Sequence, residues 1–98
     1  MTAGHTFVCY ARENSDFVRA LTISLRERGV QMWLDADIPA GADWDSAIDE
    51  HLRTCTRVVI ILSPAAVASN EVRGELRAAL NLSKTIVPVL YQPCAIPR

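Results

Sequence analysis

The chain has 98 residues, half of them apolar, and its 10 basic and 11 acidic residues give a net charge of −1. This length makes one small domain with enough apolar side chains for a core, which excludes a disordered segment. Without a basic run, nothing indicates a nucleic acid or an anionic membrane as a partner. The longest apolar run, 58–62, is far shorter than the roughly 20 residues that span a bilayer. The first residues lack a charged leader, so we expect no secretory signal.

The cysteines Cys9, Cys55 and Cys94 are widely spaced and form no CxxC pair. With only His5 and His51 as imidazole partners, their spacing predicts no zinc site. Cys9 falls inside an apolar run, which predicts a small buried thiol. The absence of a disulfide framework fits a reducing cytoplasm.

Four apolar segments predict strands, at residues 6–10, 30–34, 58–62 and 85–90. The third is five consecutive aliphatic residues, a pattern typical of a central parallel strand that is covered on both faces. The fourth contains Pro88, which cannot donate to a ladder. We therefore expect this strand near an edge of the sheet or with a bulge.

Helical spacing of apolar residues predicts a helix after each of the first three strands. Asn14 or Ser15 is expected to cap the first helix, and Gly29 to end it. Asp43 is expected to cap the second helix, and Ser69 the third. The apolar stripe predicted for the second helix consists of Trp44, Ala47, Ile48, Leu52 and Cys55.

The alternating order predicts an α/β domain, with three αβα layers around a flavodoxin-like parallel sheet. Ligands bind such sheets at the carboxyl ends of the strands, which here are residues 10–12, 35–43, 63–64 and 91 onward. Residues 35–42 include Pro39 and Gly41 and are predicted to form an irregular loop. Loops of this length in compact domains are often functional.

Several familiar chemistries are excluded by the residues at the ends of the strands. The first strand leads into no glycine-rich turn, so neither a dinucleotide-binding Rossmann site nor a P-loop is predicted. The third strand ends in Leu62 and Ser63 rather than in an aspartate, which argues against a phosphoacceptor receiver domain. His51 is expected to be a solvated histidine in mid-helix rather than part of a triad.

Two glutamates remain as candidates for chemistry. Glu71 and Glu75 are one turn apart on the third predicted helix and therefore face the same way. Partial burial of two like charges would raise the pKa of the less solvated one. The alternative from spacing alone is an exposed helix face in which both glutamates balance Arg73 and Arg77.

Several segments of the sequence, taken together, resemble bacterial TIR (Toll/interleukin receptor) domains over nearly the whole chain. Residues 7–18 are similar to the opening strand and helix of the family, and residues 29–35 and 37–44 to its second strand and BB loop. Residues 58–64 resemble the third strand, 69–76 the start of the third long helix, and 84–90 the fourth strand.

This resemblance implies one of two functions. TIR domains of the NAD-consuming branch break the bond between nicotinamide and ribose in NAD⁺, whereas others only assemble with one another. The enzymatic branch uses a glutamate of the third helix, which is Glu75 here. One carboxylate suits the reaction, because departing nicotinamide leaves positive charge on the ribose. NAD⁺ is then the substrate, and neither a cofactor nor a metal is implied.

The same resemblance implies the other site residues. The substrate-binding residues are Tyr10, Ala11, Arg12, Asp37, Ile38, Trp44 and Glu71, of which Glu71 stands where several active relatives have a tryptophan. The BB-loop residues that meet a neighbouring copy are Asp37, Ile38, Pro39, Ala40 and Gly41. Catalysis is therefore expected to follow assembly.

The family also implies a context for the chain. It indicates a cytoplasmic NAD⁺ hydrolase that yields nicotinamide and ADP-ribose or a cyclic form. Self-assembly into a homo-oligomer or filament would activate this enzyme. The domain would then be the effector of a bacterial anti-phage defence protein, with a sensor domain in the same chain. The alternatives are a non-catalytic TIR–TIR interaction module and an effector that disrupts host TIR signalling. Residues 1–98 are expected to be one TIR domain whose C-terminal strand and helices are missing.

Overall fold

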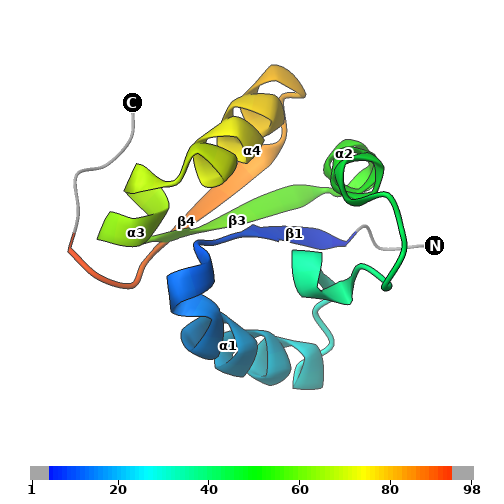
Figure 1. Ribbon diagram of the computed structural model, residues 1–98. Helices are drawn as coiled ribbons and strands as arrows, with labels where there is room; N and C mark the ends of the chain where they lie inside the picture. Colours follow the sequence, from blue (N-terminus) through cyan, green and yellow to red (C-terminus); the bar gives the residue numbers. More distant parts are fainter. Residues whose placement is uncertain (1–4, 94–98) are drawn as a thin grey trace.

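The computed structural model describes residues 5–93 and shows a parallel sheet between two layers of helices (Figure 1). The strands are β1 (Thr6–Cys9), β2 (Met32–Trp33), β3 (Arg57–Leu62) and β4 (Thr85–Leu90). Their order in the sheet is β2-β1-β3-β4, and each neighbouring pair is parallel. The predicted three-layer α/β fold with flavodoxin-like winding is confirmed.

Helices connect the strands where the sequence predicts them. They are α1 (Ser15–Glu27), α2 (Trp44–Thr54), α3 (Pro64–Ala68) and α4 (Asn70–Asn81), with 3-10 turns η1 (Arg12–Asn14) and η2 (Asp35–Asp37). The side chains of Asp43, Ser63 and Ser69 each accept a hydrogen bond from a backbone N–H in the first turn of the next helix. Gly29 has a φ of +89°, the left-handed conformation expected of a residue just past a helix end.

The cap of α1 differs from the prediction. Asn14 occupies the N-cap position, but its side chain makes no cap hydrogen bond. Instead its Oδ1 accepts a hydrogen bond of 2.6 Å from the buried hydroxyl of Ser63. This contact ties the turn after β1 to the turn after β3, so both turns at the carboxyl edge of the sheet hold each other in place.

The second strand and the segment after it also differ from the prediction. Strand β2 has two residues instead of five, because the N–H of Val30 donates to the carbonyl of Leu25 at the end of α1. Beyond the strand, the N–H of Leu34 donates to Asp37 Oδ2 at 2.9 Å. Residues 35–37 consequently form the turn η2, and the expectation of a wholly irregular loop at 35–42 is wrong for its first three residues.

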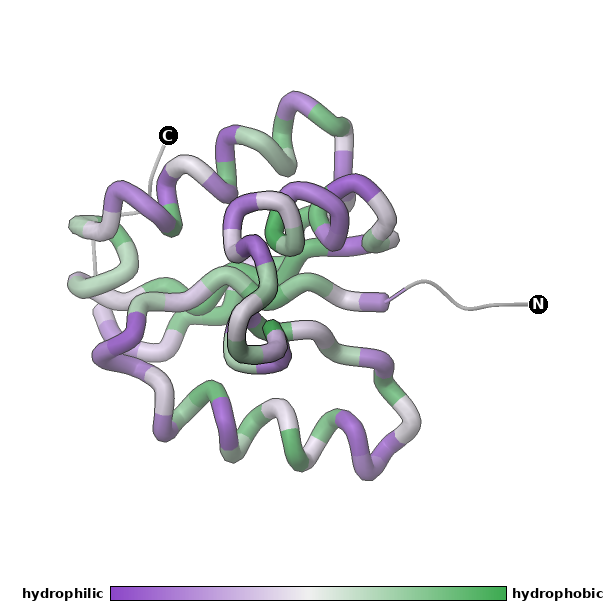
Figure 2. The backbone as a smooth tube through the Cα atoms, turned by 45° about the vertical axis from the view of Figure 1, so that its right-hand side comes forward, coloured by the Kyte–Doolittle hydropathy of each residue, from purple (hydrophilic) through white to green (hydrophobic). Residues whose placement is uncertain are grey.

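Two apolar cores lie on the two faces of the sheet. Side chains of β1 and β3 pack on one face against α2, α3 and α4 through Phe7, Cys9, Val58, Ile60, Leu62, Leu52, Ala66, Val72 and Ala79. On the other face, α1 covers a smaller cluster of Val8, Val18, Met32, Leu34, Val59 and Ile61. Figure 2 shows hydrophobic residues gathered in the central strands, and hydrophobic and hydrophilic residues alternating along the helices. This arrangement is what a parallel strand covered on both faces requires.

Strand β4 lies at an edge of the described sheet, as Pro88 predicts. The N–H of Tyr91 donates to the carbonyl of Leu62 in β3. Because N–H groups alternate in direction along a strand, the nitrogen of Pro88 points away from β3. The proline therefore removes no hydrogen bond from the β3–β4 ladder.

The cysteines Cys9 and Cys55 are buried and free, as predicted for Cys9, and Cys94 lies outside the described residues. Within residues 5–93, no helix combines the length and the apolar character needed to cross a membrane.

Candidate active site

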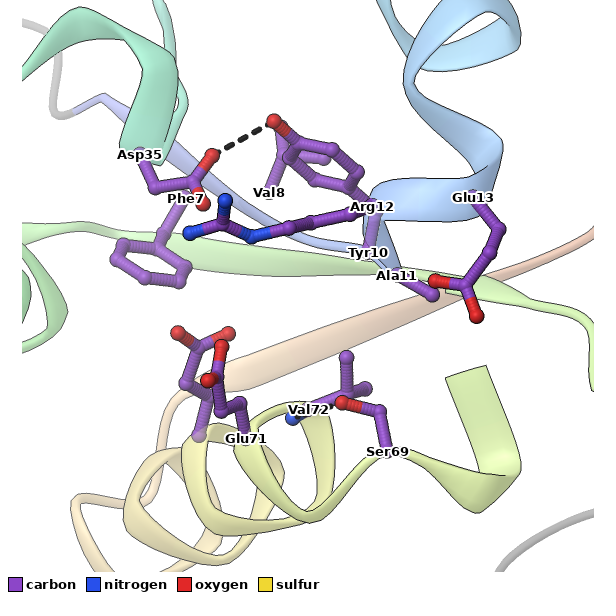
Figure 3. A pocket seen from close by; sticks show the side chains of 11 residues that line it. Phe7, Val8, Tyr10, Ala11, Arg12, Glu13, Asp35, Ser69, Glu71 and Val72 are labelled. Atoms are coloured by element: carbon purple, nitrogen blue, oxygen red, sulfur yellow. Dashed lines mark hydrogen bonds between the residues drawn. The ribbon is translucent and has the colours of Figure 1, made fainter. Parts of the chain in front are cut away.

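A cavity of about 180 Å³ opens at the carboxyl ends of β1 and β2, beside the start of α4 (Figure 3). It is lined by Phe7, Val8, Tyr10, Ala11, Arg12, Glu13, Asp35, Ser69, Glu71, Val72 and Glu75. Five of the predicted site residues come together here: Tyr10, Ala11, Arg12, Glu71 and Glu75. The fold brings them together because the turn after β1 faces the first two turns of α4.

The carboxyl group of Glu75 lies in this cavity and has a raised pKa. Its side chain is half-buried, and burial raises its pKa to about 7. The carboxylates of Asp35 and Glu71 raise the pKa further, whereas a hydrogen bond with the Cys9 thiol opposes them. A carboxyl group with such a pKa in a cleft is a candidate for a catalytic role.

Tyr10 and Asp35 form a hydrogen-bonded pair on the wall of the cavity that faces α4 (Figure 3). The phenol of Tyr10 donates a hydrogen bond of 2.6 Å to Asp35 Oδ1 (Figure 3). Burial and this carboxylate raise the pKa of Tyr10, so the phenol stays protonated at neutral pH. The pair joins the end of β1 to the start of η2.

Trp44 lies at the rim rather than in the core. Its side chain is 39% exposed, and the guanidinium carbon of Arg12 lies 5.8 Å from the centroid of its ring. Trp44 lines a groove together with Ile48 and Leu52 of the predicted apolar stripe of α2, but it is exposed rather than packed in the core. As the first residue of the helix, it lies beside the turn after β1 instead of against the sheet.

Two further cavities adjoin the first. A small one of about 190 Å³, which we call the rim cavity, is lined by Tyr10, Arg12, Ser15, Asp35, Ala36 and Trp44. A larger one of about 360 Å³, the α2–α4 groove, is lined by Trp44, Asp45, Ile48, Asp49, Leu52, Asn70, Glu71, Gly74, Glu75 and Ala78. Glu71 and Glu75 line both the first cavity and the groove. The exposed helix face considered as an alternative therefore holds for Glu71 but not for the half-buried Glu75.

The structure places Asp37 and Ile38 apart from these cavities. Asp37 Oδ2 accepts hydrogen bonds of 2.9 Å from both Arg26 and the N–H of Leu34, so its carboxylate holds η2 against α1. Ile38 is half-buried just after η2. Substrate binding by these two residues stays a prediction.

The loop beyond them is exposed. Pro39, Ala40 and Gly41 all have exposed side chains or backbone, and Gly41 has a φ of +85°. Their position on the surface leaves them accessible, and their contact with a neighbouring copy also stays a prediction.

His51 differs from the solvated residue that was expected. Its ring is half-buried and stacks on Trp33, with centroids 4.0 Å apart, and its Nδ1 lies 3.2 Å from His5 Nε2. Burial and the neighbouring His5 lower its pKa. In the part of the chain that the structure describes, no three His, Cys, Asp or Glu side chains form a group that could hold a metal ion.

The family model described as "TIR domain" matches residues 6–98. The chain belongs to the TIR domain family. Among curated proteins, this TIR domain is 29% identical over 92 residues to 2′ cyclic ADP-D-ribose synthase BtTIR of Bacteroides thetaiotaomicron. It is 27% identical over 95 residues to NAD(+) hydrolase sarm1 of Drosophila melanogaster. Each match covers 88% of the chain, but only 32% of the first relative and 7% of the second.

Solved structures confirm the fold of this TIR domain. The TIR domain of the Toll-related receptor TRR-2 of Hydra magnipapillata has a TM-score of 0.85 at 25% identity, with 97% of this chain and 76% of the other covered. The TIR domains of the activated Roq1 resistosome have a TM-score of 0.80 at 21% identity, with coverage of 90% and 57%. A metazoan TIR-STING receptor from C. gigas has a TM-score of 0.74 at 21% identity, with coverage of 90% and 31%.

Sequence reasoning missed several residues that line the TIR cavity. The most important is Asp35, which accepts from Tyr10 and raises the pKa of Glu75. Its position directly after the second strand was a usable signal, because polar residues at the carboxyl ends of parallel strands converge. Ser69 and Glu13 were also missed as lining residues. Their positions at helix starts gave no comparable signal.

Proposed function

We propose that this TIR domain cleaves the bond between nicotinamide and ribose in NAD⁺ and that Glu75 is its catalytic residue. The observation that carries the proposal is the half-buried carboxyl of Glu75, whose pKa is raised to about 7, in a cavity with Asp35 and Glu71. The names of the two curated relatives, a cyclic ADP-ribose synthase and an NAD(+) hydrolase, support the same reaction class.

The cavity suits the charge changes of this reaction. The nicotinamide ring of NAD⁺ is cationic, so a cavity lined by the carboxylates of Asp35, Glu71 and Glu75 attracts it. When the C–N bond breaks, its electron pair leaves with nicotinamide, and the positive charge passes to the ribose. A carboxylate beside the ribose stabilises this oxocarbenium-like state.

The remaining step adds a nucleophile to the ribose. If water attacks, the products are ADP-ribose and one proton. If an atom within the ADP-ribose attacks, the product is a cyclic form. Nicotinamide leaves as a neutral molecule, so the first step needs no proton from a general acid.

The proposal also covers how the enzyme is activated and in which kind of protein it acts. Self-assembly through the exposed loop residues Asp37 to Gly41 would activate the enzyme as a homo-oligomer or filament. We place it in the cytoplasm, as the effector of a bacterial anti-phage defence protein in which a further part of the chain acts as sensor. The similar TIR domains of the activated Roq1 resistosome support assembly as a theme of the family.

A second candidate function is a non-catalytic module for TIR–TIR interaction. The observation that favours it is the exposed, charged Glu71 one turn before Glu75, where it offers no aromatic surface to a substrate. In this case the loop at 37–41 serves only for docking.

Chromatography of nicotinamide distinguishes the two candidates. The protein is incubated with NAD⁺ at concentrations at which microscopy shows assemblies. Release of nicotinamide together with an equal amount of ADP-ribose or its cyclic form supports the hydrolase. Assembled protein that leaves NAD⁺ intact contradicts it and favours the interaction module.

A further inference from the structure

The proposed substrate carries a positive charge at one end and negative charges in its middle, and this difference bears on how it lies in the site. Nicotinamide is cationic, whereas the diphosphate that joins the two nucleosides has two negative charges. The cavity around Glu75 holds about 180 Å³, below the roughly 300 Å³ at which ligand pockets usually begin. A dinucleotide must therefore extend from this cavity into one of its neighbours.

The α2–α4 groove is unsuited to a diphosphate. Its lining includes Asp45, Asp49, Glu71 and Glu75 and no basic side chain. Asp49 is partly neutralised by its ion pair with Arg53 at 2.9 Å, which leaves three carboxylates without such a partner among the described residues. These carboxylates repel a dianion over the short distances at which salt does not screen them.

The rim cavity differs from the groove, because its lining combines one arginine, Arg12, with one carboxylate, Asp35. Arg12 lines both this cavity and the one around Glu75, and it is the single basic residue among the described residues that line any of the three. Within residues 5–93, Arg12 has no carboxylate at salt-bridge distance. Asp35, the carboxylate that lines the rim cavity with Arg12, accepts a hydrogen bond from Tyr10. The guanidinium is thus free for an anion.

An aromatic surface lies next to this guanidinium. Trp44 lines the rim cavity, is 39% exposed, and has Arg12 over its ring at 5.8 Å. An exposed indole offers a flat face on which a nucleobase stacks with little reorganisation. Guanidinium and indole therefore present an anion site and a stacking surface side by side, next to the cavity that holds Glu75.

We infer that Arg12 and Trp44 form the subsite for the ADP half of the substrate, with Arg12 bound to the diphosphate and Trp44 stacked on the adenine. This inference rests on the proposed function and adds the direction in which the dinucleotide lies. The ribose next to nicotinamide lies at Glu75, the diphosphate contacts Arg12, and the adenosine extends toward Trp44. The α2–α4 groove receives no phosphate.

Binding of ADP-ribose tests the subsite without requiring turnover. Calorimetry compares the wild-type chain with R12Q, R12K, W44L and W44F, and with R28Q as a matched control. Arg28 is an exposed arginine just past the far end of α1 and lines none of the three cavities. Loss of a charge-assisted hydrogen bond to phosphate predicts at least about tenfold weaker binding for R12Q. R12K and W44F should recover part of the affinity, and R28Q should stay within about twofold of wild type.

The dependence on salt adds a second readout. The wild-type affinity for ADP-ribose should fall as salt rises, and the slope should be smaller for R12Q. The inference is overturned if R12Q binds ADP-ribose as tightly as the wild-type chain does. It is also overturned if the wild-type chain shows no measurable binding at millimolar ADP-ribose. Melting curves of each variant show that the fold is intact.

Turnover separates this inference from the proposed function. Nicotinamide riboside has the scissile bond but no diphosphate. R12Q should lower the ratio of kcat/KM for NAD⁺ to that for nicotinamide riboside by at least about tenfold, mainly through the KM for NAD⁺. An unchanged ratio overturns the assignment of the diphosphate to Arg12. If the assembled wild-type protein cleaves neither compound, the proposed function fails, and the binding of ADP-ribose alone decides the inference.

Discussion

At the scale of single residues, the environment of Glu75 determines what its carboxyl group can do. Its partial burial in α4, with Asp35 and Glu71 nearby, moves its pKa to about 7, so it titrates near neutral pH. A carboxylate that is needed to stabilise a cation must be ionised when the substrate reacts. The arriving nicotinamide ring, being cationic, favours that ionised form.

This titration predicts the pH dependence of activity. The kcat/KM for NAD⁺ should rise between pH 5 and 8 with an apparent pKa near 7. E71Q removes one of the negative charges that raise the pKa of Glu75, so its profile should move toward lower pH. A stopped assay of nicotinamide across this range measures both midpoints. A flat profile for the wild-type protein contradicts an essential ionised Glu75.

The same titration predicts how stability depends on pH. In the folded state the pKa of Glu75 is raised from 4.5 to about 7, so the folded state favours the protonated form. The stability that this proton confers is fully present below pH 4.5 and is lost as pH rises through 7. E75Q carries a neutral amide and should gain about 1–2 kcal/mol over wild type at pH 8, discounted for partial exposure, but little at pH 4. Urea unfolding at both pH values measures the difference, and equal stability of both proteins at pH 8 would be evidence against a buried carboxyl.

At the scale of secondary structure, the caps and strand ends bring the site residues together. Ser69 caps α4 and sets the helix so that Glu71 and Glu75 face the turn after β1. The hydrogen bond from Ser63 to Asn14 holds that turn against the turn after β3. The sequence predicted the caps Asp43 and Ser69 and the edge position of β4, because both depend on local chemistry. It could not predict the contact of Asn14 with Ser63, because the two residues are distant in the chain.

The turn η2 gives a test of how the loop is held. Asp37 Oδ2 accepts hydrogen bonds from both Arg26 and the N–H of Leu34, so D37A removes both hydrogen bonds. D37A should cost about 1 kcal/mol more than D37N, whose amide oxygen still accepts from Leu34. The exposed ion pair with Arg26 contributes less than the backbone contact. Urea unfolding of the two variants measures this, and equal loss in both would show that the backbone contact contributes nothing.

The edge strand gives a second test at this scale. Because the nitrogen of Pro88 points away from β3, P88V should change the free energy of unfolding by less than about 1 kcal/mol. V89P should cost about 1–3 kcal/mol, because the N–H of Val89 points toward β3 as that of Tyr91 does and the proline removes this ladder hydrogen bond. P88V also adds a donor to an exposed edge and should aggregate faster, as light scattering would show. A P88V variant as unstable as V89P would contradict this register.

At the scale of the whole molecule, the fold places one acidic cavity where β1, β2 and α4 meet. The alternation of strands and helices predicted the three layers and favoured the flavodoxin-like winding, because apolar strands and amphipathic helices must bury their faces and parallel crossovers are right-handed. The site was predicted less completely. Trp44 was named both in the apolar stripe of α2 and among the substrate-binding residues, and Asp35 was placed at a strand end but not named as a site residue, because rim positions and cavity walls depend on which segments meet in space.

The chain spans about a third or less of the length of the two curated relatives. Residues 5–93 contain the proposed reaction centre and the exposed loop at 37–41. The proposed function therefore depends most on whether this centre has the chemistry assigned to Glu75.

The rate of nicotinamide release by E75Q, beside wild type and E27Q, tests this claim most directly. Glu27 is an exposed glutamate at the end of α1 and lines none of the three cavities, so E27Q controls for the loss of a charge. All three proteins are compared as assemblies at the same concentration and pH 8. We predict that wild type and E27Q release nicotinamide from NAD⁺ at similar rates, and that E75Q is at least about 100-fold slower with its fold intact. Release by E75Q at the wild-type rate would contradict the assignment of Glu75 as the catalytic residue.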